Sequence, residues 1–142
     1  MARRREARRP GAGNALARLV RTAREARRRA YAPYSGFKVG AAVLAGGEVF
    51  PGANVENASY PVGICAERAA VAAAAVSGAR RIEAVAVASG TADPTPPCGM
   101  CLQALAELGS PSLPVILVGA RGGRVETTLR ELLPRAFGKR FL

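Results

Sequence analysis

Apolar residues recur along the chain in blocks that alternate between helical and strand spacing. The first block predicts a helix from Asn14, which can cap it, to about Ala30. Its apolar stripe consists of Leu16, Leu19, Val20 and Ala23. Residues 1–13 lack this spacing, and Pro10 and a Gly-Ala-Gly run interrupt them, so we expect a disordered basic tail there.

The remaining blocks predict strands and helices in alternation. The predicted strands are 38–45, 48–56, 82–89, 114–120 and a short edge strand at 123–129, with a hairpin turn at Gly46 and Gly47. The predicted helices are 65–77, 98–108 and 129–137. Helices that alternate with central strands indicate an α/β fold whose sheet is covered on both faces. We expect residues 14–142 to form a single domain.

Charge is concentrated at the start of the chain. Residues 1–30 hold eleven arginines and two glutamates, a net charge of +9, whereas residues 31–142 hold ten basic and eight acidic residues, a net charge of +2. The leading segment can bind polyanions through counterion release, but the nearly neutral body favours a solvated tail and helix face. A nucleic-acid partner is therefore not expected. No apolar run reaches the ~18 residues of a membrane span, so we expect a cytoplasmic protein without a membrane partner.

The chain has three cysteines, Cys65, Cys98 and Cys101, and no histidine. An odd number of cysteines makes a poor disulfide framework, and the lack of histidine excludes histidine-based catalysis. All three cysteines fall at or near predicted helix starts, where the helix dipole favours the thiolate over the thiol. Thiolates are the form of cysteine that binds zinc.

Glu67 follows Cys65 in a Cys-x-Glu motif, and Cys98 and Cys101 form a Pro-Cys-x-x-Cys motif at the next predicted helix. A Cys-x-x-Cys alone is also compatible with two ordinary buried thiols. Together the motifs match the three-cysteine variant of the zinc-deaminase pattern. Catalytic zinc sites use three protein ligands and leave one position to water, whereas a structural site would need Glu67 as a fourth ligand. We therefore predict one zinc ion per chain, with Glu67 transferring protons.

Five segments extend this match. In order they are "YAPYSGFKVGAAV", "NVENASY", "CAERAAV", "PCGMCLQ" and "ELLPRAF", and from about Leu16 to the C-terminus the chain resembles the small homotetrameric zinc-dependent cytidine deaminases. The resemblance implies a three-layer α/β/α sandwich around a mixed five-stranded sheet. It implies a homotetramer that hydrolyses cytidine and deoxycytidine to uridine and deoxyuridine with release of ammonia, in pyrimidine salvage.

The resemblance also implies the substrate contacts. Asn54 and Glu56 would hydrogen-bond the ribose, and Phe37 would pack on the pyrimidine. The backbone of Ala66 would contact the exocyclic group of the base, and Phe137 would reach into the site of a neighbouring subunit. From the residues alone, Asn54 and Glu56 suit a sugar diol if the segment is extended, but two solvent-facing polar residues fit equally well.

One departure from the family concerns charge at the metal. Zinc and three thiolates sum to −1, and the family usually places two arginines nearby; one of them is Leu102 here. Arg68, on the same helical face as Cys65, is therefore expected to compensate this charge largely alone.

Three other functions remain open at this point. They are a deaminase of a modified cytosine nucleoside, like the blasticidin-S deaminases, a nucleic-acid-binding cytosine editor, and a zinc-stabilised module without activity. The "NVEN" segment favours a plain ribose, the nearly neutral body argues against the editor, and Glu67 argues against the inactive module.

Overall fold

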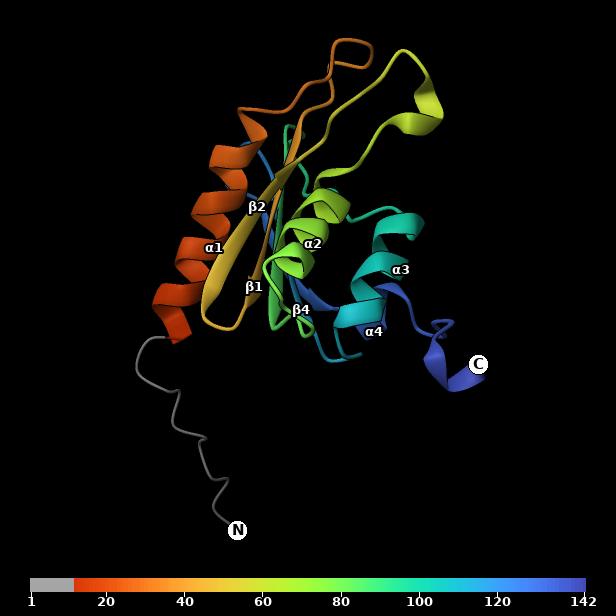
Figure 1. The fold of residues 1–142 in the computed structure, drawn as a ribbon. Helices are drawn as coiled ribbons and strands as arrows, with labels where there is room; N and C mark the ends of the chain where they lie inside the picture. The colour runs from red at the N-terminus through yellow and green to blue at the C-terminus, as the bar shows by residue number, and fades with distance from the viewer. Residues whose placement is uncertain (1–11) are drawn as a thin grey trace.

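The computed structural model describes residues 12–142 and shows one mixed sheet with helices on both faces (Figure 1). The elements in chain order are α1 (Ala12–Arg27), β1 (Val39–Ala45), β2 (Glu48–Ala53), η1 (Tyr60–Val62), α2 (Ala66–Val76), β3 (Ala84–Ser89), α3 (Gly99–Leu108), β4 (Pro114–Val118), β5 (Arg124–Thr128), α4 (Leu129–Leu132) and η2 (Lys139–Phe141). The predicted α/β class and the mixed five-stranded sheet are confirmed.

The strands lie in the order β2-β1-β3-β4-β5. Only β3 and β4 run parallel, with Val85 opposite Val115, and α3 makes the crossover between them. The other pairs are antiparallel, and Gly46 and Gly47 form the β1–β2 turn with positive φ angles of 59° and 79°. This turn is the one predicted from the glycine pair.

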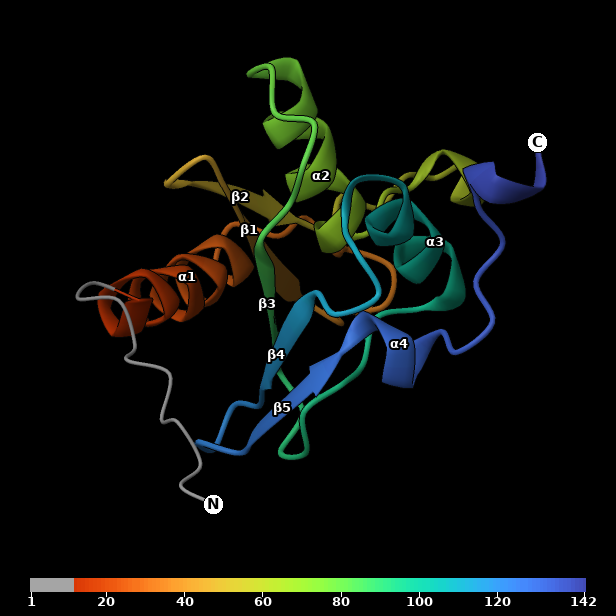
Figure 2. The same cartoon turned by 90° about the horizontal axis from the view of Figure 1, so that it is seen from below.

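Two apolar layers hold the helices to the sheet. Small side chains on one face, including Ala42 and Ala86, pack against Leu19 of α1. On the other face Val43 and Val85 belong to the layer that α2 and α3 cover. Alternate residues of each strand point to opposite faces, which is why neighbouring positions such as Ala42 and Val43 fall in different layers. Figure 2 shows α1 on one side of the sheet and α2 and α3 on the other.

Several predicted boundaries are wrong. Helix α1 begins at Ala12 instead of Asn14 and ends at Arg27 instead of Ala30. The last helix covers only Leu129–Leu132, because Pro134 cannot continue it to Phe137. Strand β2 ends at Ala53, and the residues after it leave the sheet. Of the disordered tail predicted for residues 1–13, residues 12 and 13 instead belong to α1, and residues 1–11 lie outside the described residues.

The helices of residues 12–142 do not meet the requirements for a membrane span. None of them combines the length and the apolar character that crossing a bilayer requires.

Candidate functional site

The three cysteines meet where the N-termini of α2 and α3 converge. Cys65 is the N-cap of α2, Cys98 is the N-cap of α3, and Cys101 lies in the first turn of α3. The Sγ atoms of Cys65 and Cys98 are 4.0 Å apart, and those of Cys98 and Cys101 are 3.5 Å apart. All three thiols are free and lie within 4.8 Å of one another. Zinc–sulfur bonds of ~2.3 Å in a tetrahedron separate sulfur atoms by ~3.8 Å, so these positions fit a zinc ion.

A close backbone contact positions the first turn of α2. A Cβ atom on Gly52 would lie 2.3 Å from the carbonyl oxygen of Ala66, so only glycine lets β2 and α2 approach this closely. The same side of the helix buries Ala66, Ala70 and Ala74, whose short side chains let the helix pack closely on the sheet. This packing fixes the place of Cys65, which directly precedes the helix.

The thiols differ in their tendency to ionise. Burial opposes ionisation of Cys98, but the backbone N–H groups of Cys101 and Met100 and the neighbouring thiols outweigh it, and the pKa of Cys98 lies below its ordinary value. Burial, the charge of Glu67 and the neighbouring thiols raise the pKa of Cys101. Three thiolates this close to a carboxylate are stable together only with a cation among them. The donor set therefore has the chemistry that zinc requires.

Glu67 lies in the first turn of α2 and is only 5% exposed. Burial raises the pKa of its carboxyl group above the ordinary 4.5, although its own backbone N–H, the Cys101 thiol and Arg68 oppose this shift. A buried carboxyl group of raised pKa beside a metal site is suited to accept and return protons. The structure places Glu67 beside the Cys101 thiol, and its proton-transfer role stays a prediction.

Arg68 extends toward the same thiols. Cys65 first and Cys101 second are the partners that raise the pKa of its guanidinium. Its Nη2 atom lies 3.5 Å from the carbonyl oxygen of Gly63, and its buried Nε has no hydrogen-bond partner among residues 12–142. A cationic side chain that interacts with Cys65 and Cys101 suits a site with excess negative charge. Leu102 belongs to the core layer behind α3, so apolar packing accounts for that residue.

Asn54 holds the start of β1. Its Oδ1 atom accepts a hydrogen bond from the Val39 N–H at 2.8 Å, and its Nδ2 atom donates to the carbonyl oxygen of Phe37 at 2.7 Å. The amide therefore fixes the segment that carries Phe37, and the Phe37 ring is exposed.

Glu56 holds the preceding loop. Its carboxylate accepts hydrogen bonds from the N–H groups of Tyr34 at 3.0 Å and Ser35 at 3.1 Å, and from the Ser35 hydroxyl at 2.5 Å. The Ser35 hydroxyl is the largest of the causes that lower the pKa of Glu56. The sequence did not reveal the role of Ser35. Its only signal is the serine before Gly36, which has a positive φ of 70° and so marks a tight turn.

A cavity of about 430 Å³ joins these two residues to the metal site. Asn54, Glu56 and Cys65 all line it, and Tyr34 and Tyr60 pack edge to face at its wall with ring centroids 5.8 Å apart. The structure thus brings the predicted sugar contacts and the first cysteine into one cavity. Ala66 adjoins it in the chain and is buried, whereas Phe37 is not part of its lining.

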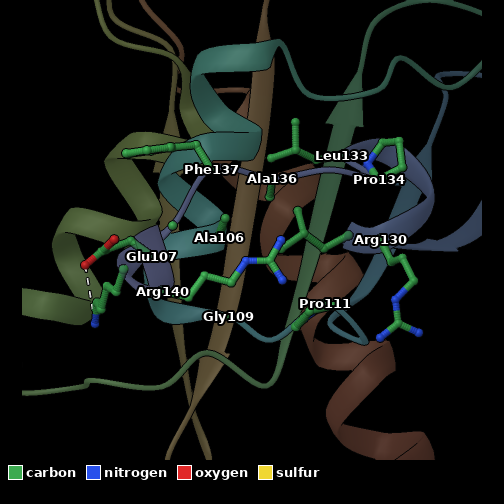
Figure 3. Close-up of a pocket in the computed structure, with 13 residues that line it drawn as sticks. Ala106, Glu107, Gly109, Pro111, Arg130, Leu133, Pro134, Ala136, Phe137 and Arg140 are labelled. Carbon is green, nitrogen blue, oxygen red and sulfur yellow. Dashed lines mark ion pairs between the residues drawn. The ribbon is translucent and has the colours of Figure 1, made fainter. Parts of the chain in front are cut away.

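Phe137 lies elsewhere in the same chain. It lines a second cavity of about 430 Å³ between α3, α4 and the C-terminal segment (Figure 3). The Gln103 side chain donates a hydrogen bond to the Phe137 carbonyl oxygen at 3.0 Å, and the ring stacks on Phe141 with centroids 5.9 Å apart. Within its own chain Phe137 therefore does not reach the cysteine cavity.

Comparison with known proteins agrees with this geometry. Residues 14–117 match the model of the cytidine and deoxycytidylate deaminase zinc-binding region. The chain is 45% identical over 122 residues to a cytidine deaminase of Sporosarcina psychrophila, covering 85% of this chain and 90% of that protein. It is 48% identical over 120 residues to a cytidine deaminase of Halalkalibacterium halodurans, covering 84% of this chain and 91% of that protein.

Solved structures show the same relationship. The fold matches the 1.6 Å crystal structure of cytidine deaminase from Burkholderia pseudomallei with a TM-score of 0.82 and 48% identity, covering 85% of this chain and 98% of that one. The match to cytidine deaminase from Mycobacterium tuberculosis has a TM-score of 0.75 and 40% identity. It covers 87% of this chain and 97% of that one.

Proposed function

The chain belongs to the family of zinc-binding cytidine and deoxycytidylate deaminases, and from this premise we propose how its own residues carry out the reaction. It is a zinc-dependent hydrolase that deaminates cytidine and releases ammonia. The observation that carries the proposal is the meeting of three thiols and a buried glutamate at the starts of two helices.

Cys65, Cys98 and Cys101 would hold one zinc ion as thiolates. Zinc supplies a Lewis acid there, which makes water a nucleophile at neutral pH. The Glu67 carboxylate takes a proton from the attacking water and delivers it to the ring nitrogen N3 of the cytosine. A second proton from the same water passes through Glu67 to the amino group, which leaves as ammonia. The raised pKa of Glu67 suits both steps, because the group must hold a proton and then release it.

The cavity between Glu56 and Cys65 would bind the nucleoside, with the base toward Cys65 and the sugar toward Asn54 and Glu56. Asn54 and Glu56 can each form a further hydrogen bond to the sugar. The second Nδ2 proton of Asn54 is not used in the bond to Phe37, and a carboxylate that accepts three hydrogen bonds keeps one lone-pair site. The contacts with the loop hold the two side chains in place before substrate arrives.

The base would be held by two further contacts. The backbone of Ala66, at the start of α2, would meet its exocyclic group, and the exposed Phe37 ring would close onto its face. Deoxycytidine would bind in the same way as cytidine.

Four chains would assemble around these cavities. Tyr60, Val62, Met100 and Phe137 are exposed apolar residues, and Tyr60 is 75% exposed. Exposed apolar surface of this kind is typical of subunit interfaces. A neighbouring chain would cover it and insert Phe137 into the site. Three reduced thiols require a reducing compartment, so we place the enzyme in the cytoplasm, in pyrimidine salvage.

A direct assay tests the proposal. Purified protein is added to cytidine, and loss of the ultraviolet band of cytidine is followed together with ammonia release. Deoxycytidine, free cytosine, a blasticidin-like nucleoside and a cytosine-containing oligonucleotide are run alongside. We expect turnover of cytidine and deoxycytidine only. Turnover confined to the modified nucleoside or to the oligonucleotide would contradict the proposal.

A further inference from the structure

Arginine side chains cover the outer face of α1. Arg18, Arg21 and Arg24 follow one another at intervals of three residues, and Arg28 comes four residues later in the turn after the helix. All four are exposed. With a rise of ~1.5 Å per residue, the row spans roughly 15 Å. It lies on the opposite face of the sheet from α2 and α3, which carry the cysteines (Figure 2).

Most of these guanidinium groups have no partner within residues 12–142. Arg18 donates a hydrogen bond to the carbonyl oxygen of Gly47 at 2.7 Å. Among residues 12–142, the side chains of Arg21, Arg24 and Arg28 are in neither a hydrogen bond nor an ion pair. Their charge is therefore available to a ligand.

The helix dipole accounts for only part of the row. A helix dipole favours cations only within its last turn, which in α1 contains Arg24 and Arg27. Arg18 and Arg21 lie outside that turn, and like charges at i and i+3 destabilise a helix.

The sequence before α1 adds to this charge. Residues 1–13 precede the matched family region, which begins at residue 14, and hold five arginines and one glutamate. The body of the chain, residues 31–142, carries a net charge of only +2. The positive potential of the molecule is thus concentrated at α1 and the segment before it.

The sequence alone favours a solvated helix face for these arginines. From their exposed placement in the structure we propose instead that the row of Arg18, Arg21, Arg24 and Arg28 binds the sugar–phosphate backbone of nucleic acid, at a site separate from the cavity that holds cytidine. The planar guanidinium group of arginine matches the geometry of phosphate oxygens. The exposed positions of α1 carry no aromatic residue on which unpaired bases could stack, so the row suits the backbone of a duplex better than a single strand. Contacts to phosphate carry no sequence information, so binding should not depend on base sequence.

A membrane surface is a poorer partner for the same charges. An interfacial helix needs a free apolar face to bury among lipid chains. In α1 that face consists of Leu19, Val20 and Ala23, and all three are packed on the sheet. Phosphate groups along a polymer can be reached by the arginines without exposing this stripe.

The test measures binding of the full chain to a fluorescent duplex of about 20 base pairs by anisotropy at several salt concentrations. The duplex contains only A·T pairs, so it offers no cytosine to the active site. The test variant is Arg21→Gln/Arg24→Gln/Arg28→Gln. The matched control is Arg81→Gln/Arg121→Gln/Arg130→Gln, which removes the same charge from exposed positions of the body.

We expect the wild-type chain to bind, and the test variant to bind at least about tenfold more weakly at roughly 50 mM salt. The slope of log K against log salt should fall by about 2.7, or about 0.9 for each lost phosphate contact. The control variant should stay within about threefold of wild type, and both variants should deaminate cytidine at the wild-type rate.

Three results would overturn this inference. The first is no duplex binding by the wild-type chain, the second is an equal loss in both variants, and the third is binding to anionic vesicles without binding to the duplex. None of them bears on cytidine turnover, so failure of the proposed reaction and failure of this site are distinguishable.

Discussion

Gly52 of β2 and Ala66 of α2 touch through their backbones, because a Cβ atom on Gly52 would lie 2.3 Å from the Ala66 carbonyl oxygen. The turn of helix that rests on this contact begins directly after Cys65 and contains Glu67. The position of the metal site relative to the sheet therefore depends on the absence of one side chain.

Substitution of Gly52 should disturb both stability and metal binding. Gly52→Ala forces the first turn of α2 away from β2, and we expect the free energy of unfolding to fall by about 1–3 kcal/mol. Zinc content should fall with it, because Cys65 moves with the helix. Chemical denaturation and metal analysis of the purified protein measure the two effects.

Gly13→Ala is the matched control, since a Cβ atom there meets nothing within 4 Å. Alanine is the better helix former, so this variant should be as stable as wild type or more stable by up to about 1 kcal/mol. A Gly52→Ala protein with wild-type stability and zinc content would show that the contact does not position the site.

Removal of the proton-accepting group should separate catalysis from metal binding. Glu67→Gln keeps the shape of the side chain but cannot accept a proton, so we expect kcat to fall by about 10²–10⁴-fold with zinc content unchanged. The exposed Glu48→Gln serves as control and should retain full activity. A Glu67→Gln enzyme within about threefold of wild type would exclude this residue as the proton carrier.

Much of this site was predictable because its residues form short sequence patterns that can be recognised locally. Cys65 and Glu67 stand at the start of an alanine-rich helix, and Cys98 and Cys101 share one turn of the next, so the pattern of each segment is sufficient to indicate a metal site. The end of α2 follows an equally local signal, Gly78 with its φ of 102°.

The unpredicted features depend on contacts between distant parts of the chain. The hydrogen bonds from the Ser35 N–H and hydroxyl to Glu56 span 21 residues, and those of Asn54 span 15 and 17. No local pattern signals which backbone groups will meet a side chain across such a distance. The overextended last helix is a different case, because Pro134 lay within the predicted segment and already argued against it.

The hydrogen bonds of Glu56 should make the loop of Tyr34 and Ser35 sensitive to acid. The pKa of Glu56 lies below its ordinary 4.5, so its ionised form stabilises the loop at pH above 4.5, and this stabilisation is lost as pH falls through the lower pKa of the folded state. The amide proton shifts of Tyr34 and Ser35 should follow this titration in NMR spectra.

Two variants test the assignment. Glu56→Gln should abolish the titration, and Ser35→Ala should move it to higher pH because the hydroxyl is the largest cause of the lowered pKa. An unchanged midpoint in Ser35→Ala would show that the hydroxyl does not stabilise the carboxylate.

The proposed assembly of four chains predicts a site shared between subunits. Phe137→Ala should leave the mass of the particle at four chains by light scattering, while kcat/KM falls by about tenfold, or ~1.4 kcal/mol. Phe141→Ala is the matched control, because Phe141 is the stacking partner of Phe137 and similarly exposed. It should change kcat/KM by less than about twofold.

Coexpression sharpens this test. In a mixed particle of Glu67→Gln and Phe137→Ala chains, some sites receive Glu67 from one chain and Phe137 from the other. Such particles should be more active than an equal mixture of the two variants assembled separately. An active monomer, or no gain in the mixed particles, would contradict the shared site.

The guanidinium of Arg68 should determine how tightly the metal is bound. Zinc with three thiolates carries a net charge of −1, and the thiols of Cys65 and Cys101 are the neighbours that raise the pKa of the Arg68 side chain. Arg68→Ala leaves that charge uncompensated, so zinc should be lost to a chelator about 10–100-fold more readily. Arg68→Lys keeps the charge but not the planar donor, and should lie between Arg68→Ala and wild type. Arg81→Ala, on the exposed surface, is the control and should behave as wild type. Zinc retention in Arg68→Ala equal to that of the control would mean that Arg68 does not compensate the site.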